Sequence, residues 1–253
     1  MLKKRVIPML LLRDGRMVKG VRFTDFRDTG NPRTAVRIYS AQDADELVFL
    51  DIQAGLQSRR ALVDIVRDAA AECFMPLAAG GGVRSIEDVR ELLRAGADKV
   101  VVTTAAVEDA SLVGAIAERF GSQCVVAGID YRSGPEGERV WIGCGTRATG
   151  LEPAAHAEEL VRRGAGEILL NCIDRDGTMQ GYDLATARRV ADAVPVPVIV
   201  AGGAGNFMHL AEVLQGTAAS AAACASLFHF GDNNPIRARS YLRNLGVPMR
   251  VLK

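Results

Sequence analysis

The chain is poor in aromatic residues, histidine and cysteine. Phe, Trp and Tyr make up 5% of its 253 residues, and there are three His and five Cys. No two cysteines stand in a CxxC arrangement, so neither a zinc site nor a redox motif of that spacing is expected. The odd number of cysteines fits reduced thiols in a cytoplasmic protein better than a disulfide framework. We expect no metal ion and no cofactor.

An excess of charge and a long apolar run are also missing. The chain has 31 Lys and Arg against 30 Asp and Glu, which gives a net charge of +1. Because the two signs are interspersed, neither nucleic acid nor a membrane surface is an expected partner. No apolar stretch reaches the roughly 18 residues of a membrane span, and the first residues lack the features of a signal peptide. These absences predict a cytoplasmic location.

One motif is present twice. Ala79-Gly80-Gly81-Gly82 and Ala201-Gly202-Gly203-Ala204 each follow a proline-led apolar run. The two prolines, Pro76 and Pro197, are 121 residues apart, which is close to half the chain. Other segments keep this offset, so the sequence predicts two matching halves.

Short β-branched runs alternate with amphipathic segments along the chain, as in βαβ units. The expected strands are Val6–Leu12, Leu47–Ile52, Pro76–Gly80, Lys99–Thr103, Cys124–Ile129, Ile168–Cys172, Pro197–Ala201 and Ser220–Ala223. The expected helices are Arg60–Cys73, Ser85–Ala95, Ala110–Arg119, Pro153–Arg163, Asp183–Ala193 and Phe207–Gln215, with glycine closing four of them (Gly96, Gly121, Gly164, Gly216). This order predicts an α/β fold, a (β/α)₈ TIM barrel. We expect one domain over residues 1–253, made of pseudo-symmetric half-barrels at about 1–121 and 122–253.

Hydrogen-bond donors for an anion gather at the expected strand ends, which form the working face of such a barrel. One cluster is Gly81, Gly82, Thr103 and Thr104; the other is Gly202, Gly203 and Ser226, with Gly177 as a further candidate. Glycine lets backbone N–H groups approach an anion, and a following helix N-terminus adds a favourable dipole. Two clusters at one barrel mouth predict a substrate with a phosphate at each end. The alternative is that the glycines only permit tight turns.

Carboxylates also follow the expected strands. Asp130 ends an apolar strand and is the leading candidate for acid–base catalysis. Asp176 lies in an Asp-Gly loop, where it is either a weaker candidate or part of a turn. Asp51 lies at the end of the expected strand Leu47–Ile52. The repeat predicts a carboxylate opposite Asp130 at the end of the first strand, but Leu11 lies there.

The chain resembles the cyclase subunit of imidazole glycerol phosphate synthase, the HisF family, over essentially its full length. The stretches that carry the resemblance are 14–20, 45–52, 80–85, 121–123, 164–170, 174–178 and 228–231. The resemblance implies an enzyme of the lyase class in histidine biosynthesis. Such a barrel adds ammonia from a separate glutaminase subunit to a bisphosphate ribonucleotide, giving imidazole glycerol phosphate and aminoimidazole carboxamide ribotide. It also implies two acid–base aspartates, one at Asp130 and one at the position of Leu11.

Leucine cannot transfer a proton, and the chain also differs from the usual cyclases at Thr103 and Asn171. Residues 71–77 and 232–239 resemble HisF-like paralogues of surface-polysaccharide gene clusters. Such paralogues pair with a glutaminase and deliver ammonia to an amidotransferase that converts a sugar acetamido group to an acetamidino group. We favour this role. A housekeeping cyclase and a non-catalytic regulatory barrel are the alternatives.

Four charged residues lie at the starts of four expected strands: Arg5, Glu46, Lys99 and Glu167. Polar residues at the bottom of a barrel usually stabilise the fold. The resemblance implies instead that these four form the gate by which ammonia enters, and that Asp98 and Gln123 face a HisH-like glutaminase. No cysteine has a plausible catalytic histidine partner, so ammonia is expected from another subunit.

Overall fold

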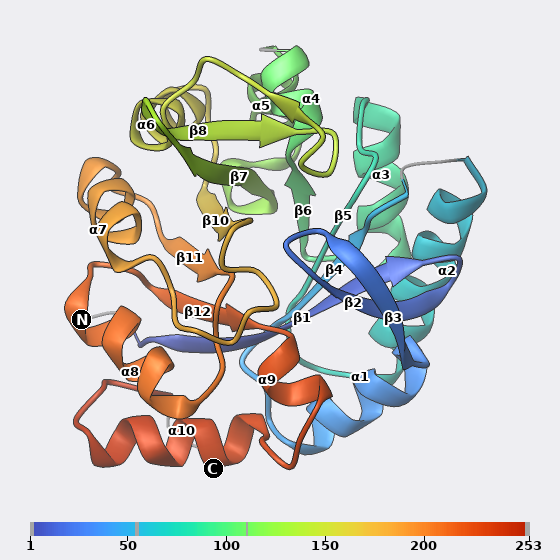
Figure 1. Cartoon of the computed structure of the whole chain (residues 1–253). Helices are drawn as coiled ribbons and strands as arrows, with labels where there is room; N and C mark the ends of the chain where they lie inside the picture. Colours follow the sequence, from blue (N-terminus) through green and yellow to red (C-terminus); the bar gives the residue numbers. More distant parts are fainter. Residues whose placement is uncertain (1–2, 54–55, 110, 251–253) are drawn as a thin grey trace.

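A closed ring of eight parallel strands forms the centre of the computed structural model, which describes residues 3–53, 56–109 and 111–250 (Figure 1). The barrel strands are β1 (Arg5–Arg13), β4 (Leu47–Asp51), β5 (Leu77–Gly80), β6 (Lys99–Val102), β7 (Val125–Gly134), β10 (Glu167–Cys172), β11 (Val198–Ala201) and β12 (Ala221–Cys224). β1 pairs with both β4 and β12, and β7 pairs with both β6 and β10, so the sheet closes on itself. The predicted (β/α)₈ barrel and its eight strands are confirmed.

Helices surround the strands (Figure 1). The six predicted helices are α2 (Leu56–Glu72), α3 (Ile86–Ala95), α5 (Leu112–Phe120), α6 (Pro153–Arg162), α7 (Leu184–Ala193) and α8 (Phe207–Gly216). Ala110, the expected first residue of α5, lies outside the described residues. The sequence did not predict α1 (Pro32–Ala41), α4 (Thr104–Glu108), α9 (Ser226–His229), α10 (Pro235–Asn244) or the 3₁₀ turn η1 (Ser122–Cys124).

The helix ends follow local rules. Ser85 and Asp88 form a reciprocal capping box at the start of α3, and Gly96 closes that helix with a φ of 110°. Asn206 caps α8, and Asn234 caps α10 just before Pro235. Gly216 differs from the expectation, because it is the last residue of α8 and has no positive φ.

The repeat seen in the sequence recurs in the strands. β11 begins 121 residues after β5, and β12 begins 122 residues after β6. β7 begins 120 residues after β1, and β10 begins 120 residues after β4. Equivalent strand ends of the two halves therefore lie across the barrel mouth from each other.

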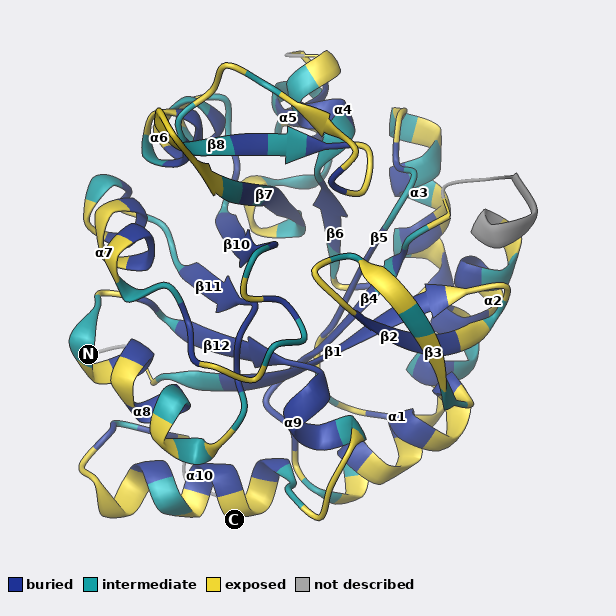
Figure 2. Cartoon of the chain, viewed as in Figure 1, coloured by how far each residue is buried: buried dark blue, intermediate teal, exposed yellow. Residues whose placement is uncertain are grey.

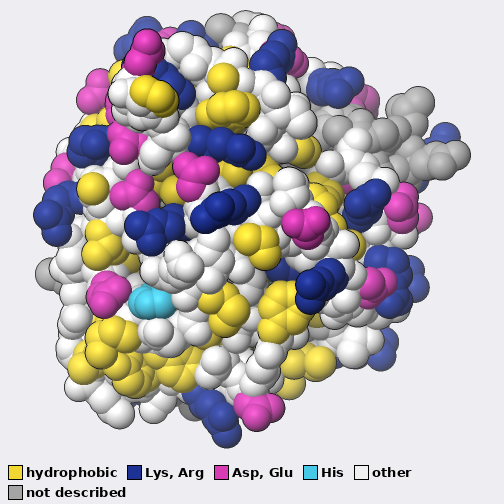
Figure 3. Space-filling view, viewed as in Figure 1, with side chains coloured by type: hydrophobic (Ala, Val, Ile, Leu, Met, Phe, Trp, Pro, Cys, Tyr) yellow, Lys and Arg dark blue, Asp and Glu magenta, His cyan; other side chains and the backbone are white. Residues whose placement is uncertain are grey.

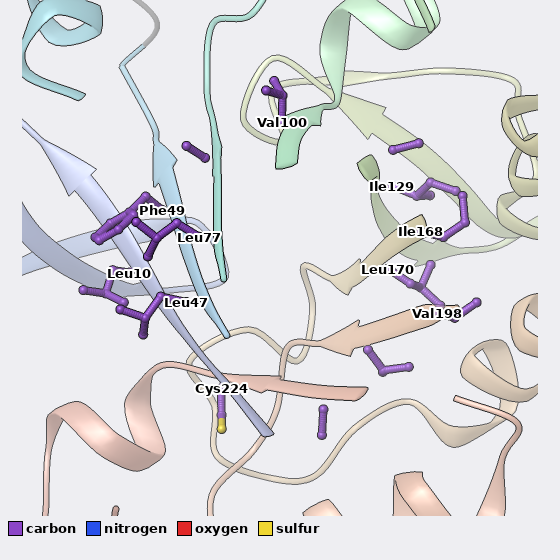
Figure 4. Packing of buried hydrophobic residues seen from close by; sticks show 14 of the residues in the cluster. Leu10, Leu47, Phe49, Leu77, Val100, Ile129, Ile168, Leu170, Val198 and Cys224 are labelled. Atoms are coloured by element: carbon purple, nitrogen blue, oxygen red, sulfur yellow. The ribbon is translucent and has the colours of Figure 1, made fainter. Parts of the chain in front are cut away.

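Side chains alternate between the inside of the barrel and the helices, as the strand period of two requires. Along β1, Ile7 and Met9 belong to the inner cluster, while Val6 and Leu10 belong to the outer one. Figure 4 shows outer residues from several strands, and Figure 2 shows that the barrel strands are largely buried. The inner cluster is Ile7, Met9, Val48, Ala78, Val101, Val126, Leu169, Ile199, Ala201, Ala221 and Ala223. The lumen is thus apolar at mid-height.

Two hairpins that the sequence did not predict extend the sheet at the C-terminal end of the barrel. β2 (Arg16–Val21) and β3 (Thr24–Gly30) follow β1, while β8 (Gly137–Ile142) and β9 (Arg147–Ala148) follow β7. β3 is mostly exposed (Figure 2), so it lacks the apolar alternation by which strands are recognised.

On the face shown in Figure 3, basic and acidic side chains are interspersed. None of the helices described in the structure is long and apolar enough to span a membrane.

Candidate functional site at the barrel mouth

A pocket of about 210 Å³ opens at the C-terminal ends of the barrel strands, and we call it the barrel-mouth pocket. The inward-facing columns of the barrel end here: Leu11 on β1, Asp130 on β7 and Asn171 on β10. Asp51, Cys144, Asp176 and residues of the first glycine cluster complete much of the wall, and Phe23 and Phe26 of the β2–β3 hairpin line it too. The pocket therefore contains most of the chemical groups that the sequence singled out.

The carboxyl group of Asp130 lines the barrel-mouth pocket and has a strongly shifted pKa. Burial raises the pKa of its carboxyl to about 7; the Asn171 amide opposes this rise, and the nearby Asp176 adds to it. Asn171 is the register partner of Asp130 on the neighbouring strand β10. It donates a hydrogen bond from Nδ2 to Oδ1 of Asp130 at 3.0 Å. A group with a pKa near 7 acts as either acid or base at neutral pH.

Leu11 lies in the same pocket as Asp130, at the end of the inward-facing column of β1. It is 5% exposed, pairs with Leu50 of β4 and places only hydrocarbon against the pocket. The position that the repeat reserves for a second acid–base residue is therefore filled by a side chain that can neither donate nor accept a proton.

Two buried oxygen atoms of pocket residues have no hydrogen-bond partner within the described part of the chain. They are Oδ2 of Asp51 and Oδ1 of Asn171. The other carboxylate oxygen of Asp51 accepts from the backbone N–H of Gln53 at 2.9 Å. Native proteins leave few buried polar atoms unpaired, so these two acceptors indicate a pocket that binds a hydrogen-bond donor.

Asp176 is held by a cation that the sequence analysis did not single out. Nζ of Lys19 lies 2.5 Å from Oδ2 of Asp176, and both side chains are almost fully buried. Burial raises the pKa of Asp176, and the Lys19 ammonium opposes the rise. As an ion-pair partner at the edge of the pocket, Asp176 is less suited than Asp130 to exchange a proton.

The first glycine cluster lies at the ends of β5 and β6. Gly81 and Gly82 both have positive φ, and a Cβ on Gly81 would stand 2.1 Å from the backbone oxygen of Asp51. Close packing alone thus requires glycine at 81. Thr103 and Thr104 line the same pocket, and Thr104 accepts a hydrogen bond from the Gly143 N–H at 3.0 Å, which leaves its hydroxyl hydrogen to donate.

The residues expected for the second glycine cluster also lie together, but they surround a much smaller cavity. Gly177, Gly202, Gly203 and Ser226 line a cavity of about 10 Å³, together with Lys19 and Asp176. A Cβ on Gly203 would stand 2.1 Å from the carbonyl oxygen of Gly181, so this glycine is also required by packing. The two clusters are thus equivalent in sequence but unequal in size, although the second has a lysine beside it.

At the opposite end of the barrel, four charged residues form a closed ring. Arg5 is paired with Glu46 at 2.6 Å and with Glu167. Lys99 is paired with Glu46 at 2.9 Å and with Glu167 at 2.7 Å. Both glutamates are at least 95% buried, and burial raises the pKa of Glu46 even though Lys99 and Arg5 oppose the rise. We call these four residues the charged ring.

Asp98 and Gln123 lie at the same end, just before β6 and β7, and both are exposed. Asp98 accepts a hydrogen bond from the backbone N–H of Leu77 at 2.8 Å, and Gln123 donates to the Phe120 carbonyl at 3.3 Å. These contacts give each side chain a local structural role, and both remain accessible to another protein.

The sequence analysis missed parts of the site that depend on the hairpins. Lys19, Phe23 and Phe26 reach the site through β2–β3, and Cys144 reaches it from the loop after β8. One signal was available for Lys19, which directly follows the apolar residues Met17 and Val18 in the sequence. The partnership of Lys19 with Asp176 spans 157 positions and has no local signal.

The fold and the site together define the class of this protein: a (β/α)₈ barrel with acid–base and anion-binding candidates at the C-terminal ends of its strands. A comparison with protein-family models finds a match to the family described as histidine biosynthesis protein, over residues 5–234. The matched range contains all eight barrel strands. The chain therefore belongs to this family of HisA/HisF-type barrel enzymes.

The raised pKa of Asp130 predicts a pH-dependent gain of stability when the carboxylate is replaced. The folded protein binds this proton up to about pH 7, whereas the unfolded chain releases it near the ordinary aspartate pKa of 3.8, so stability falls as the pH rises between these values. We expect Asp130→Asn to stabilise the protein by about 4 kcal/mol at pH 8 and to have little effect at pH 4. Chemical denaturation at the two pH values measures this difference. An equal effect at both values would contradict the assigned pKa.

The glycine clusters predict anion binding at the barrel mouth. Crystals soaked in sulfate should show an anion between Gly82 and Thr104, with weaker occupancy beside Gly203 and Ser226, where the cavity is smaller. Thr104→Val, which keeps the shape and removes the hydroxyl, should reduce occupancy at the first cluster only. Electron density without an anion at both clusters would show that the glycines serve the backbone alone.

Proposed function

We propose that this chain is the ammonia-accepting barrel of a glutamine amidotransferase, of the HisF type. A glutaminase docks on the face that carries the charged ring, Asp98 and Gln123. Ammonia passes through the barrel and leaves at the mouth, where an amidotransferase takes it up to form an acetamidino group on a surface-polysaccharide sugar. A cytoplasmic location follows from this role.

The observation that carries the proposal is the arrangement of the inward-facing columns. The column of β1 runs from Arg5 through Ile7 and Met9 to Leu11, and that of β10 runs from Glu167 through Leu169 to Asn171. Each therefore starts in the charged ring, crosses an apolar layer and ends in the barrel-mouth pocket. An apolar layer favours neutral ammonia over the ammonium ion, because an unpaired charge is costly to bury.

The reaction of the housekeeping cyclase is the second candidate, and specific groups favour it. Asp130 has a pKa near 7, and Asp51 and Asn171 place in the same pocket acceptor atoms that have no partner among the described residues. Against it stands Leu11, since loss of a general acid or base typically costs about 10²–10⁴ in rate. We therefore favour the relay of ammonia over cyclisation as the function of this chain.

The experiment that tests the proposed partnership is a binding measurement with a HisH-like glutaminase from the same source. We expect a one-to-one complex that is weakened when Asp98 is replaced by Arg, because this exposed carboxylate lies beside the ring. The matched control is Glu136→Arg, because Glu136 is exposed in the turn between β7 and β8, at the other end of the barrel. Absence of a complex, or equal weakening by both changes, would count against docking on this face.

A further inference from the structure

A second cavity lies outside the barrel, between α1 and the segment that joins α9 to α10 (Figure 1). Its volume is about 350 Å³, larger than the 210 Å³ of the barrel-mouth pocket. One wall of the cavity is formed by one face of α1 together with its N-cap and C-cap residues. These lining residues follow the helical spacing and are Asn31, Thr34, Ala35, Ile38, Tyr39 and Gln42. We call this cavity the α1 groove. Its volume lies within the range of small-molecule sites, about 300–1,000 Å³.

Unpaired polar atoms are concentrated in the α1 groove. Oγ1 of Thr29, Oε1 of Gln42 and both ring nitrogens of His229 are buried without a hydrogen-bond partner among the described residues. These three residues come from the end of β3, the end of α1 and the end of α9. Because folded proteins pair nearly all of their buried polar groups, such a convergence from three elements marks a place where a ligand or water supplies the missing hydrogen bonds.

The charges of the groove restrict the kind of ligand. Burial lowers the pKa of His229 to about 4, with a further contribution from the charge of Lys19, so its ring is neutral at neutral pH. Of the described residues that line the groove, Asp232 is then the only one with a charged side chain. The lining offers neither the cations that a phosphate needs nor the cluster of carboxylates that a metal ion needs.

The hydrogen-bonding capacity of the groove is mixed. A neutral imidazole has one donor and one acceptor nitrogen, a threonine hydroxyl does both, and the Gln42 oxygen accepts. A ligand that satisfies these atoms must itself both donate and accept, as hydroxyl groups do. Tyr39 and Phe228 also line the groove, and their ring centroids are 6.3 Å apart at 54°. They offer apolar surface to the C–H groups of such a ligand.

We propose that the α1 groove binds a small uncharged polyhydroxyl compound, a sugar or cyclic polyol, through Thr29, Gln42 and His229. The hydroxyl groups meet the unpaired polar atoms, and the carbon skeleton packs against Tyr39 and Phe228. This inference does not depend on the proposed relay of ammonia, because it uses no residue of the charged ring or of the barrel-mouth pocket.

The test is ligand binding by the whole chain, followed by ¹H–¹⁵N shift mapping. The probes are D-glucose, N-acetyl-D-glucosamine and myo-inositol, with glucose 6-phosphate as the charged comparison. We expect at least one neutral probe to bind with a Kd below about 1 mM, more tightly than the phosphate ester. The shifted amides should lie in residues 29–42 and 228–234.

Variants separate this groove from other binding. His229→Phe and Gln42→Leu keep the approximate shape while removing the polar atoms, and each should weaken binding at least about tenfold. His156→Phe is the matched control, because His156 also has a pKa lowered to about 4 and an Nε2 without a partner among the described residues. His156 belongs to α6, and this helix lies across the barrel from α1 (Figure 1). Thermal unfolding shows whether each variant is folded. If one of the two groove variants does not fold, the other still tests the proposal.

Three outcomes overturn the proposal. The first is that no neutral probe binds at about 10 mM, which is tenfold above the expected limit. The second is that binding persists in both His229→Phe and Gln42→Leu. The third is that the shifted amides lie only at the barrel mouth.

Discussion

The unmodified chain is expected to convert the bisphosphate ribonucleotide at least about 10²-fold more slowly than a family cyclase, even when ammonium salts are supplied. Ammonium bypasses any glutaminase, so the rate reports the chemistry of the barrel itself. The physical reason is Leu11, which places hydrocarbon in the pocket where a second acid–base group is needed opposite Asp130. Steady-state kinetics beside a family cyclase measure the difference.

Leu11→Asp should recover part of this turnover, since it supplies a carboxylate in the pocket that contains Asp130. Leu50→Asp is the matched control, because Leu50 pairs with Leu11 in the sheet and lines the same pocket. Recovery by Leu11→Asp alone supports the assigned position. Equal recovery by both variants would mean that any added carboxylate suffices, and fast turnover by the unmodified chain would favour the housekeeping cyclase.

Lys99→Glu is expected to lower glutamine-dependent transfer at least about tenfold, which corresponds to about 1.4 kcal/mol of added barrier. Lys99 neutralises Glu46 and Glu167, so the change gathers three carboxylates and one arginine at the entrance of the lumen. Product formation is measured with the glutaminase, the amidotransferase and the acceptor sugar, and the ammonium-dependent rate should be nearly unchanged.

Lys3→Glu is the control for this experiment, because Lys3 is exposed and precedes the ring residue Arg5 by two positions. Circular dichroism and thermal unfolding test whether both variants are folded. If Lys99→Glu retains its glutamine-dependent rate, the charged ring stabilises the barrel and does not serve as its entrance.

The barrel was predictable because its signals are local. Each barrel strand is a short apolar run, and Gly81 and Gly203 mark strand ends where a side chain would collide with neighbouring backbone. The hairpin of β2 and β3 had no such signal, since β3 is mostly exposed and polar. The helix α1 was missed as well, although Pro32 and the cap at Asn31 are typical of a helix start.

The site was predictable to the extent that it follows from strand ends. Asp130, Leu11 and the glycine clusters were located by their positions after apolar runs, and the structure brings the first cluster together with Asp130 and Leu11. The ion pair of Lys19 with Asp176 was not predictable, because it needs a hairpin to fold back over the mouth. The difference in size between the cavities at the two glycine clusters also depends on tertiary packing.

The most direct test of the account follows the nitrogen atom. The chain is combined with its glutaminase, glutamine labelled with ¹⁵N in the amide, and the bisphosphate ribonucleotide. We predict that the label appears as free ammonium, or on the sugar when the amidotransferase and its acceptor are added, and that imidazole glycerol phosphate forms at least about 10²-fold more slowly than with a family cyclase. Rapid entry of ¹⁵N into the imidazole ring would contradict the account and identify the barrel as a working cyclase.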